Sequence, residues 1–557
     1  MKTHDKFQVS GKIADLRNGR IFSGTIDIED GKIKAIAETD HVPDQYILPG
    51  LIDSHVHIES SMLIPSEFAR LAVAHGTVAT VSDPHEIANV MGIEGIKYMI
   101  SNGKKVPFKF YFGASSCVPA TAFETAGASI GTDALDELLG SGEIKYMSEM
   151  MNFPGVLFND PEVMAKIAIA KKHNKPIDGH APGLVGEEAR RYIQAGITTD
   201  HECFTMEEAL EKIKWGMKIQ IREGSAAKNF DALVDLLDQY PDQVLFCSDD
   251  KHPNDLEKGH INELVKRAIA RGHDPMKVLR SCILNPVEHY GLDVGLLRVG
   301  DDADFILVDN LQEFNVRATY VQGMKVGENG KSLIESVPES APNVFNAEKI
   351  STEDIRVPFQ PGKLQVIQAL EGQLITKAMS VEPKIKNGNV ESDVERDILK
   401  LVVYNRYQAA RPVVAFISNF NLKSGAMAST VAHDSHNIIA IGTNDEDLVR
   451  AINLLIEAKG GVSLVDGDQE ELLPLPVAGL MSAGDAYRIA AAYDKLDRLT
   501  KEKGSTLRAP YMTLSFMALL VIPELKLSDK GLFDGARFAF TPLFSDSQKT
   551  FNVENHI

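Results

Sequence analysis

The sequence has few cysteines and no long apolar run. Four cysteines occur among 557 residues, at positions 117, 203, 247 and 282, without paired spacing. Proteins of oxidising compartments commonly carry cysteines at paired spacings that form disulfides, and this chain has none. We therefore expect its thiols to be buried and reduced, and the protein to be cytoplasmic. Apolar stretches such as residues 516–523 are much shorter than the ~20 residues that a membrane span requires. Residues 1–6 carry no apolar segment, so no signal peptide is expected.

Basic residues are also scarce relative to acidic ones. The 58 Lys and Arg stand against 78 Asp and Glu, which gives a formal net charge of −20. A nucleic-acid surface needs a basic patch, so this balance argues against a nucleic-acid partner. A hydrophobic content of 44% with 24% charged residues is typical of a globular protein. The length predicts two or three domains.

The most informative motif is His55-Val56-His57, which ends the apolar run 46–53. In an extended segment, residues at i and i+2 project to the same face. Two neutral imidazoles on one face bind a shared divalent cation well. In parallel barrels, catalysis takes place at the carboxyl ends of the strands. An isolated His-x-His is equally compatible with one capping and one packing histidine, so its interpretation depends on the rest of the chain.

Four later β-prone segments also end in metal-binding side chains. Helix-period segments at 160–173, 187–195 and 206–215 lie between them, as expected for successive strand–helix units. The repetition predicts a metal site assembled from strand ends. The four end residues are Glu149, His180, His201 and Asp249.

This order of ligands resembles the amidohydrolase superfamily, whose members are metal-dependent hydrolases on (β/α)₈ barrels. Many relatives bridge their metals with a carboxylated lysine at the fourth strand. In this chain Lys145 comes too early in its run, and Glu149 holds the strand end. The resemblance implies an α/β fold with a barrel over 49–295 and two divalent ions, manganese or iron foremost and zinc as the alternative. The implied ligands are His55, His57, Glu149, His180, His201 and Asp249.

Longer motifs are similar to those of the bacterial adenine deaminase family. They lie at residues 57–62, 83–92, 115–120, 221–227, 432–437 and 473–482, and the resemblance runs from about residue 10 to 540. It implies conversion of adenine and water to hypoxanthine and ammonia in purine salvage. The expected partner is this small substrate, with no nucleic acid or membrane, and the chain is expected to form a dimer or tetramer.

The implied mechanism is attack on adenine C6 by a hydroxide that bridges the metals, with an aspartate as proton shuttle. Asp249 follows the small Ser248 at its strand end, and we choose it as ligand and shuttle. Asp250 fits an Asp-x-x-Pro spacing with Pro253 and stays the alternative.

Two segments are candidates for binding the purine. His85 and Glu86 end the strand at 77–83, where either side chain is placed to donate to a ring nitrogen; the alternative for Glu86 is a helix cap. Arg222 and Ser225 end the predicted seventh strand and are candidates for gripping the base. A surface salt bridge explains Arg222 equally well.

One dense polar cluster lies outside the predicted barrel. His433, Asp434 and His436 fall within four residues, a spacing that suits an accessory metal site or closure over the pocket. The alternative is an exposed polar turn. The histidines at 75, 173, 260 and 273 are expected to be ordinary surface residues.

The strand patterns also predict the domain layout. Residues 1–48 and 296–330 alternate in short runs, with Asp30-Gly31 as a hairpin turn, and should form one small β-sandwich domain around the barrel. A charged stretch at 328–346 reads as a linker. Residues 345–557 mix strands and helices and predict a C-terminal α/β domain.

Two other functions remain open at this stage. One is a different amidohydrolase, either a cyclic amide hydrolase or a deaminase of another base; the absence of a strand-end lysine disfavours the lysine-bridged members. The other is a catalytically inactive amidohydrolase-like protein, which would have no need for four histidines at strand ends.

Overall fold

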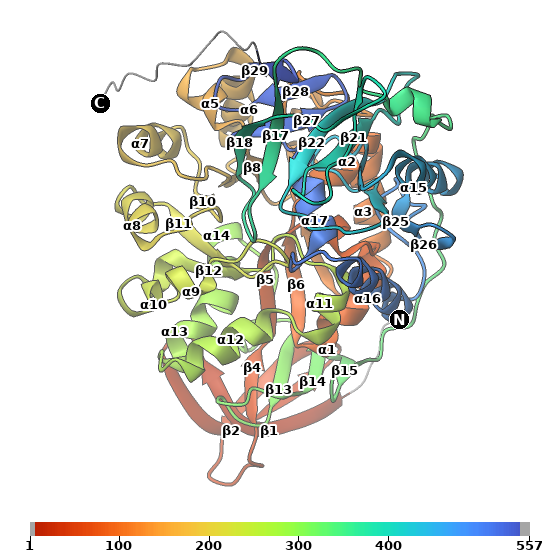
Figure 1. Cartoon of the computed structure of the whole chain (residues 1–557). Helices are drawn as coiled ribbons and strands as arrows, with labels where there is room; N and C mark the ends of the chain where they lie inside the picture. The colour runs from red at the N-terminus through yellow and green to blue at the C-terminus, as the bar shows by residue number, and fades with distance from the viewer. Residues whose placement is uncertain (1–5, 546–557) are drawn as a thin grey trace.

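The structure, a computed structural model, describes residues 6–545. At the lower end of Figure 1, strands from both flanks of the chain's central region pair into one eight-stranded sheet. The two flanks join because β4 pairs in parallel with β1 and antiparallel with β13. In spatial order the strands are β16 (Lys331–Ser332), β15 (Met324–Glu328), β14 (Val316–Val321), β13 (Phe305–Val308), β4 (Tyr46–Pro49), β1 (Lys6–Asp15), β2 (Arg20–Glu29) and β3 (Lys32–Glu38).

This sheet differs from the predicted sandwich in one respect. The strands form a single continuous sheet, since β4 connects the two halves edge to edge. The predicted hairpin at Asp30-Gly31 is confirmed: Glu29 pairs with Lys32, and both turn residues have positive φ, at 53° and 74°. Two-residue turns of this kind match the twist of paired strands. Val9, Ile26 and Phe305 belong to the apolar core of this sheet.

Eight short parallel strands occupy the centre of the molecule. Ladders join β5–β6–β7, β8–β9 and β10–β11–β12. The bridges Ala114–Met147 and Val56–Asp249 continue the pairing from β7 to β8 and from β12 back to β5, and Thr198 N donates to Ile177 O between β9 and β10. We call β5–β12 the strand ring. Its members are β5 (Leu51–Val56), β6 (Thr77–Ser82), β7 (Lys109–Phe112), β8 (Met147–Met150), β9 (Ile177–Gly179), β10 (Thr199–Asp200), β11 (Lys218–Arg222) and β12 (Val244–Cys247).

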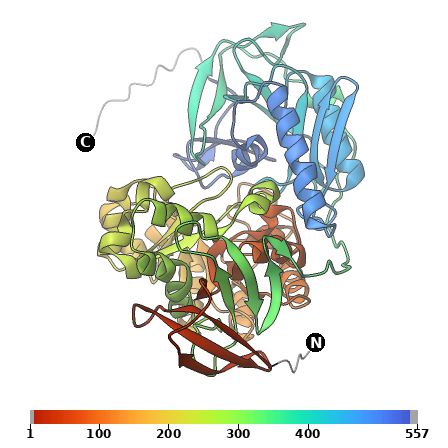
Figure 2. The same cartoon turned by 90° about the horizontal axis from the view of Figure 1, so that it is seen from below.

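Helices follow the ring strands and surround them (Figure 2). Their starts follow local capping chemistry: the Asp160 side chain accepts from the backbone of Glu162 and Val163, and Thr205 accepts from Glu208 N. The helices are α1 (Pro65–Ala74), α2 (His85–Met91), α3 (Ile93–Gly103), α4 (Thr132–Gly140), α5 (Phe153–Leu157), α6 (Pro161–Lys172), α7 (Gly186–Gln194), α8 (Met206–Lys214), α9 (Phe230–Leu233), α10 (Leu236–Gln239), α11 (Pro253–Lys258), α12 (Ile261–Ala270), α13 (Pro275–Leu279) and α14 (Asn285–Tyr290).

A nine-stranded sheet forms the core of the C-terminal region. Its strands are β18 (Thr376–Val381), β17 (Lys363–Ala369), β22 (Val413–Ser418), β21 (Leu399–Tyr404), β24 (Ile438–Gly442), β23 (Ala426–Ser429), β25 (Gly461–Asp466) and β26 (Gln469–Pro474) in order, with β30 (Phe544–Ser545) on β17. The remaining elements are the hairpin β19 (Ile385–Lys386) and β20 (Asn389–Val390), the small sheet β27 (Leu525–Ser528), β28 (Gly531–Asp534) and β29 (Ala539–Phe540), and helices α15 (Asp445–Ala458), α16 (Ala486–Glu502) and α17 (Pro510–Ser515).

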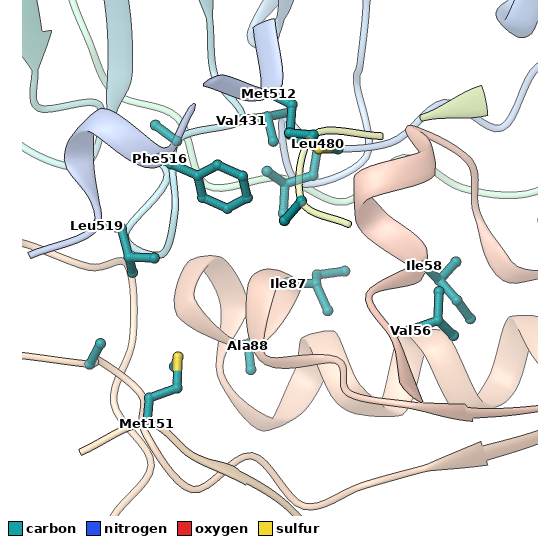
Figure 3. Packing of buried hydrophobic residues seen from close by; sticks show 14 of the residues in the cluster. Val56, Ile58, Ile87, Ala88, Met151, Val431, Leu480, Met512, Phe516 and Leu519 are labelled. Atoms are coloured by element: carbon teal, nitrogen blue, oxygen red, sulfur yellow. The ribbon is translucent and has the colours of Figure 1, made fainter. Parts of the chain in front are cut away.

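The C-terminal region packs directly on the ring's carboxyl end. Ile87, Ala88 and Met151 from the ring side share one buried apolar cluster with Phe516 and Leu519 (Figure 3). The segment that joins the two regions is also held in place, because Asn102 and Lys105 of the α3 region donate to Glu339. The two regions therefore have a common core.

Within residues 6–545, no helix has both the length and the apolar character that a membrane crossing requires.

Candidate metal centre

The ends of β5, β8 and β12 bring four predicted ligands together. His57 Nε2 lies 3.5 Å from Glu149 Oε1 and 3.4 Å from Asp249 Oδ1. His55 Nε2 lies 3.7 Å from the same Asp249 oxygen. All four side chains are buried. Strand alternation explains the geometry, since His55 and His57 are two residues apart and turn to the same side.

The ends of β9 and β10 add two more histidines on the other side of Glu149. Its Oε2 atom lies 3.0 Å from His180 Nδ1 and 3.3 Å from His201 Nε2. The His55 and His201 rings stack at a centroid distance of 4.2 Å. The two oxygens of Glu149 thus face two groups of histidines, which is the arrangement of a bridging carboxylate.

The chemistry of this donor set fits divalent cations. Both ring nitrogens of His55 are buried without a hydrogen-bond partner within residues 6–545, and one of them, Nε2, is the nitrogen that faces Asp249. An unpaired buried nitrogen is costly unless a cation or proton binds it. Donor spacings of 3.0–3.7 Å also match the edges of a coordination shell with ~2.1 Å metal–ligand distances. Imidazole with carboxylate suits manganese, iron and zinc.

Glu202 belongs to this centre although the sequence interpretation did not assign it. Its Oε1 atom lies 3.3 Å from His201 Nε2 and 3.6 Å from His180 Nδ1. Its other oxygen accepts from Arg222 Nη2 at 2.9 Å. The run Asp200-His201-Glu202 is the sequence feature that marks it, because three consecutive metal-capable side chains are unusual at one strand end.

Arg222 is fully buried, so the surface salt bridge considered for it is wrong. Its guanidinium contacts both oxygens of Glu202 and donates from Nη1 to Asp249 Oδ2 at 2.5 Å. Burial alone would raise the pKa of Asp249, but Arg222 and the nearby histidines outweigh burial and hold it well below its usual range. Arg222 therefore fixes two carboxylates of the centre in their ionised form.

Asp249 and Asp250 are in different environments. Asp249 has a φ of 54°, a left-handed conformation that Asp tolerates, and its N–H donates to His55 O. Its carboxylate faces the His-x-His pair. Asp250 accepts from the Ser60 hydroxyl at 2.5 Å, and burial with the adjacent Asp249 raises its pKa.

His85 and Glu86, the first two residues of α2, lie between the metal centre and the C-terminal region. His85 Nδ1 is 3.6 Å from Glu149 Oε1, and His85 Nε2 is 3.4 Å from Glu86 Oε1. Glu86 contacts two histidines of the 432–437 segment: Oε1 faces His433 Nδ1 at 2.5 Å and Oε2 faces His436 Nε2. Because both Glu86 oxygens contact these histidines, the side chain does not cap α2, and its alternative role as a helix cap is wrong.

The 432–437 segment is likewise not an exposed turn. His433, Asp434 and His436 are at most 3% exposed. Ser225, by contrast, is turned to other partners: its hydroxyl donates to Asp255 at 2.7 Å and accepts from His252 N.

A small cavity of about 20 Å³ lies over these groups. Carboxylates and imidazoles of the strand ends form its polar side, and Leu374, Phe516 and Leu519 of the C-terminal region form its apolar side. The full lining is His57, His85, Glu86, Glu149, Met151, His180, His201, Glu202, Asp249, Asp250, Leu374, His433, Asp434, Phe516 and Leu519.

His260 corrects the expectation of a surface histidine. It is buried, with Nε2 2.8 Å from Asp53 Oδ2 and Nδ1 2.7 Å from the Thr77 hydroxyl. Asp53 also accepts from the backbone of Ser248 and His55. This network lies below the metal centre and ties the ends of β5 and β12 together.

Two protein families match the sequence. The amidohydrolase family matches residues 46–326, and the adenine deaminase C-terminal domain family matches residues 373–539. The first match contains the strand ring, and the second contains most of the nine-stranded sheet.

Curated relatives match over nearly the whole chain. An adenine deaminase of Salinibacter ruber is 53% identical over 97% of this chain and 99% of its own. One of Methanosarcina mazei is 54% identical over 96% and 99%, and one of Parabacteroides distasonis is 48% identical over 96% and 98%. A solved dihydroorotase structure aligns with a TM-score of 0.45 and 16% identity over 59% of this chain and 99% of its own.

Proposed function

The chain belongs to the adenine deaminase family of metal-dependent amidohydrolases, and we propose that it converts adenine and water to hypoxanthine and ammonia. The observation that carries this proposal is the buried set of imidazoles and carboxylates around Glu149. Such a set distinguishes an active hydrolase from an inactive relative, because unpaired buried ligands have no use in a binding protein.

We propose two divalent ions, manganese or iron foremost, bound by six side chains. When bound, such ions lower the pKa of water toward ~7 and so supply hydroxide at neutral pH. Glu149 would hold both ions, since its two oxygens face different histidines. The proposed ligands are His55, His57, Glu149, Asp249, His180 and His201.

Deamination also requires proton transfer, which we assign to Asp249. A proton must leave the attacking water, and one must reach the departing amine nitrogen. Asp249 Oδ1 faces His55 and His57, and Arg222 keeps the carboxylate ionised and oriented. Arg222 is therefore proposed to position Asp249 rather than to hold the base. Asp250, fixed by Ser60, stays the alternative shuttle.

We assign the first contact with the purine to His85. It lines the cavity between Glu149 and Glu86, so its imidazole is within reach of a base bound beside the metal centre. Ser225 donates to Asp255 and is absent from the cavity lining, which does not favour its predicted contact with the base.

We further propose that the strand ring and its helices are the (β/α)₈ barrel of the family. Pairing that runs in chain order from β5 to β12 and back to β5 supports this. The proposed domains are residues 1–48 with 296–330, residues 49–295 and residues 345–557. The ligands then lie at the carboxyl ends of the strands, where barrel enzymes place their chemistry.

The test is ammonia release from a panel of bases by the manganese-loaded protein. Adenine should give stoichiometric hypoxanthine, while adenosine, guanine and cytosine should give much lower rates. A faster reaction with any other member of the panel would replace adenine as the substrate. No reaction across the panel, with two metals bound, would overturn the assignment as a hydrolase of these compounds.

A further inference from the structure

We propose that His433 contacts the purine directly, through its Nε2 atom, and that Glu86 and His436 position it. This inference deepens the proposed function and rests on it. By this inference the C-terminal region contributes a substrate-binding residue, and it also encloses the cavity.

The hydrogen bonds around His436 define its tautomer. The backbone N–H of Ala432 donates to His436 Nδ1 at 3.2 Å. That nitrogen must therefore be the acceptor of the ring, and the proton is on Nε2. Nε2–H points at Glu86 Oε2, so this contact is a hydrogen bond from histidine to carboxylate. A metal at this nitrogen would have to displace its proton, which disfavours the accessory metal site.

Glu86 then holds His433 by the same chemistry. Its other oxygen is 2.5 Å from His433 Nδ1. Burial alone would raise the pKa of Glu86, but His433, His436 and His85 hold it well below its usual range. A carboxylate that accepts two imidazole N–H groups is ionised, so Glu86 is not the protonated donor to the purine that the sequence suggested.

A further contact, besides the one with Glu86, fixes the orientation of the His433 ring. The ring stacks on Phe516 with a centroid distance of 4.8 Å and an interplanar angle of 20°. With Nδ1 bound to Glu86, Nε2 is the nitrogen left for the cavity that His433 lines. This is the arrangement by which a carboxylate commonly orients a catalytic imidazole.

Charge around the cavity favours a protonated His433. Burial alone would lower the pKa of His433, but Glu86 and Asp250 raise it to about 9. Burial lowers the pKa of His436, which matches its neutral tautomer. An imidazolium at 433 pairs with one ionised Glu86 and presents Nε2–H to the substrate. Attack at C6 places negative charge on the purine ring, and a donor fixed in advance stabilises that charge.

The walls beside His433 suit a flat aromatic ligand. Phe516 and Leu519 from the C-terminal region and Met151 from the ring side line the cavity beside His433. Apolar walls with a few convergent polar groups are typical of small-molecule sites. A purine whose polar edge is directed toward His433 would accept a hydrogen bond from His433 Nε2.

The test compares His433→Ala with matched variants in the manganese-loaded protein. His433→Ala should keep two metal equivalents and a near wild-type melting temperature, yet lose about 100-fold or more in kcat/KM for adenine. Added imidazole should restore part of the rate. His436→Phe should lose roughly tenfold in kcat/KM, and His436→Gln, which keeps an N–H donor toward Glu86, should recover part of that loss. His289→Ala, whose ring contacts the Thr198 hydroxyl, is the unrelated control.

Binding of hypoxanthine by calorimetry separates this inference from the proposed function. If wild type fails to deaminate adenine but binds hypoxanthine, and His433→Ala weakens that binding tenfold, the contact stands while the reaction is wrong. Two outcomes overturn the contact itself. One is kcat/KM within threefold of wild type in His433→Ala, and the other is loss of a metal equivalent in that variant, which would make His433 a ligand.

Discussion

At the scale of single residues, Glu149 has the most demanding position in the molecule. Its Oε1 atom faces His57 and its Oε2 atom faces His180 and His201, and it is 3% exposed. A buried carboxylate among imidazoles is stable when a cation neutralises it. Removing its charge should therefore alter metal binding before it alters the fold.

We predict that Glu149→Gln lowers bound metal to one equivalent or fewer and reduces turnover of adenine by several orders of magnitude. Elemental analysis and ammonia release measure the two effects. Glu124→Gln is a matched control, because burial raises the pKa of Glu124 to about 8 and the amide then replaces a neutral acid. Two equivalents of metal with unchanged turnover would mean that another residue bridges.

His55 and His57 allow a second test at this scale. We predict that His55→Ala or His57→Ala reduces metal-dependent deamination to background while far-UV circular dichroism stays near wild type. Apolar clusters and the parallel pairing of β5 with β6 hold the ring strands, and alanine at position 55 or 57 leaves both in place, so the fold should persist. Full activity in a metal-replete Ala variant would remove both residues from the ligand set.

At the scale of elements, the strand ends were predictable and the contacts across long stretches of sequence were not. His55 and Glu149 lie where short β-prone runs end, and local patterns place such residues well. Glu202 was missed because β10 ends at Asp200, so strand alternation does not predict where the next two side chains point. The contact of Glu86 with His433 joins residues 347 apart in the sequence. No local pattern records such a pairing, although both motifs were recognised separately.

Lys526 in strand β27 links the stability of the C-terminal region to pH. Lys526 is buried and donates to the carbonyls of Leu374 and Phe516, two residues of the cavity wall. Burial lowers the pKa of Lys526 to about 7. The unfolded chain therefore binds more protons than the folded one between pH 7 and about 10.5, and stability from this group rises with pH in that window.

We predict that the melting temperature of wild type rises relative to Lys526→Met as the pH increases from 7 to 9.5. The free energy of unfolding of wild type, relative to the variant, should increase by on the order of 1 kcal/mol per pH unit at most. Scanning calorimetry of both proteins measures the difference, and the surface variant Lys530→Met controls for general effects of removing a lysine. If the difference in melting temperature between wild type and Lys526→Met stays constant from pH 7 to 9.5, Lys526 is charged in the folded protein throughout this range.

At the scale of the whole molecule, the C-terminal region completes the site and cannot be treated as an appendage. One buried cluster runs from the ring side, through Ile87, Ala88 and Met151, to Phe516 and Leu519 (Figure 3). The nine-stranded sheet supports the loop that carries His433. The cavity of about 20 Å³ holds about one water molecule, so the cover must shift when a purine enters.

The last prediction concerns a chain that ends at residue 344. It keeps every proposed metal ligand but loses the apolar wall and the partners of Glu86. Exposed contiguous apolar surface promotes association, so this fragment should elute as oligomers and bind a hydrophobic dye. Its turnover of adenine should fall at least 100-fold even with manganese added, because water enters and nothing positions the base. Gel filtration, dye fluorescence and ammonia release test these outcomes on fragment and full chain in parallel. A monomeric, dye-silent fragment with wild-type turnover would show that residues 1–344 form a complete enzyme, and the contact assigned to His433 would fall with this prediction.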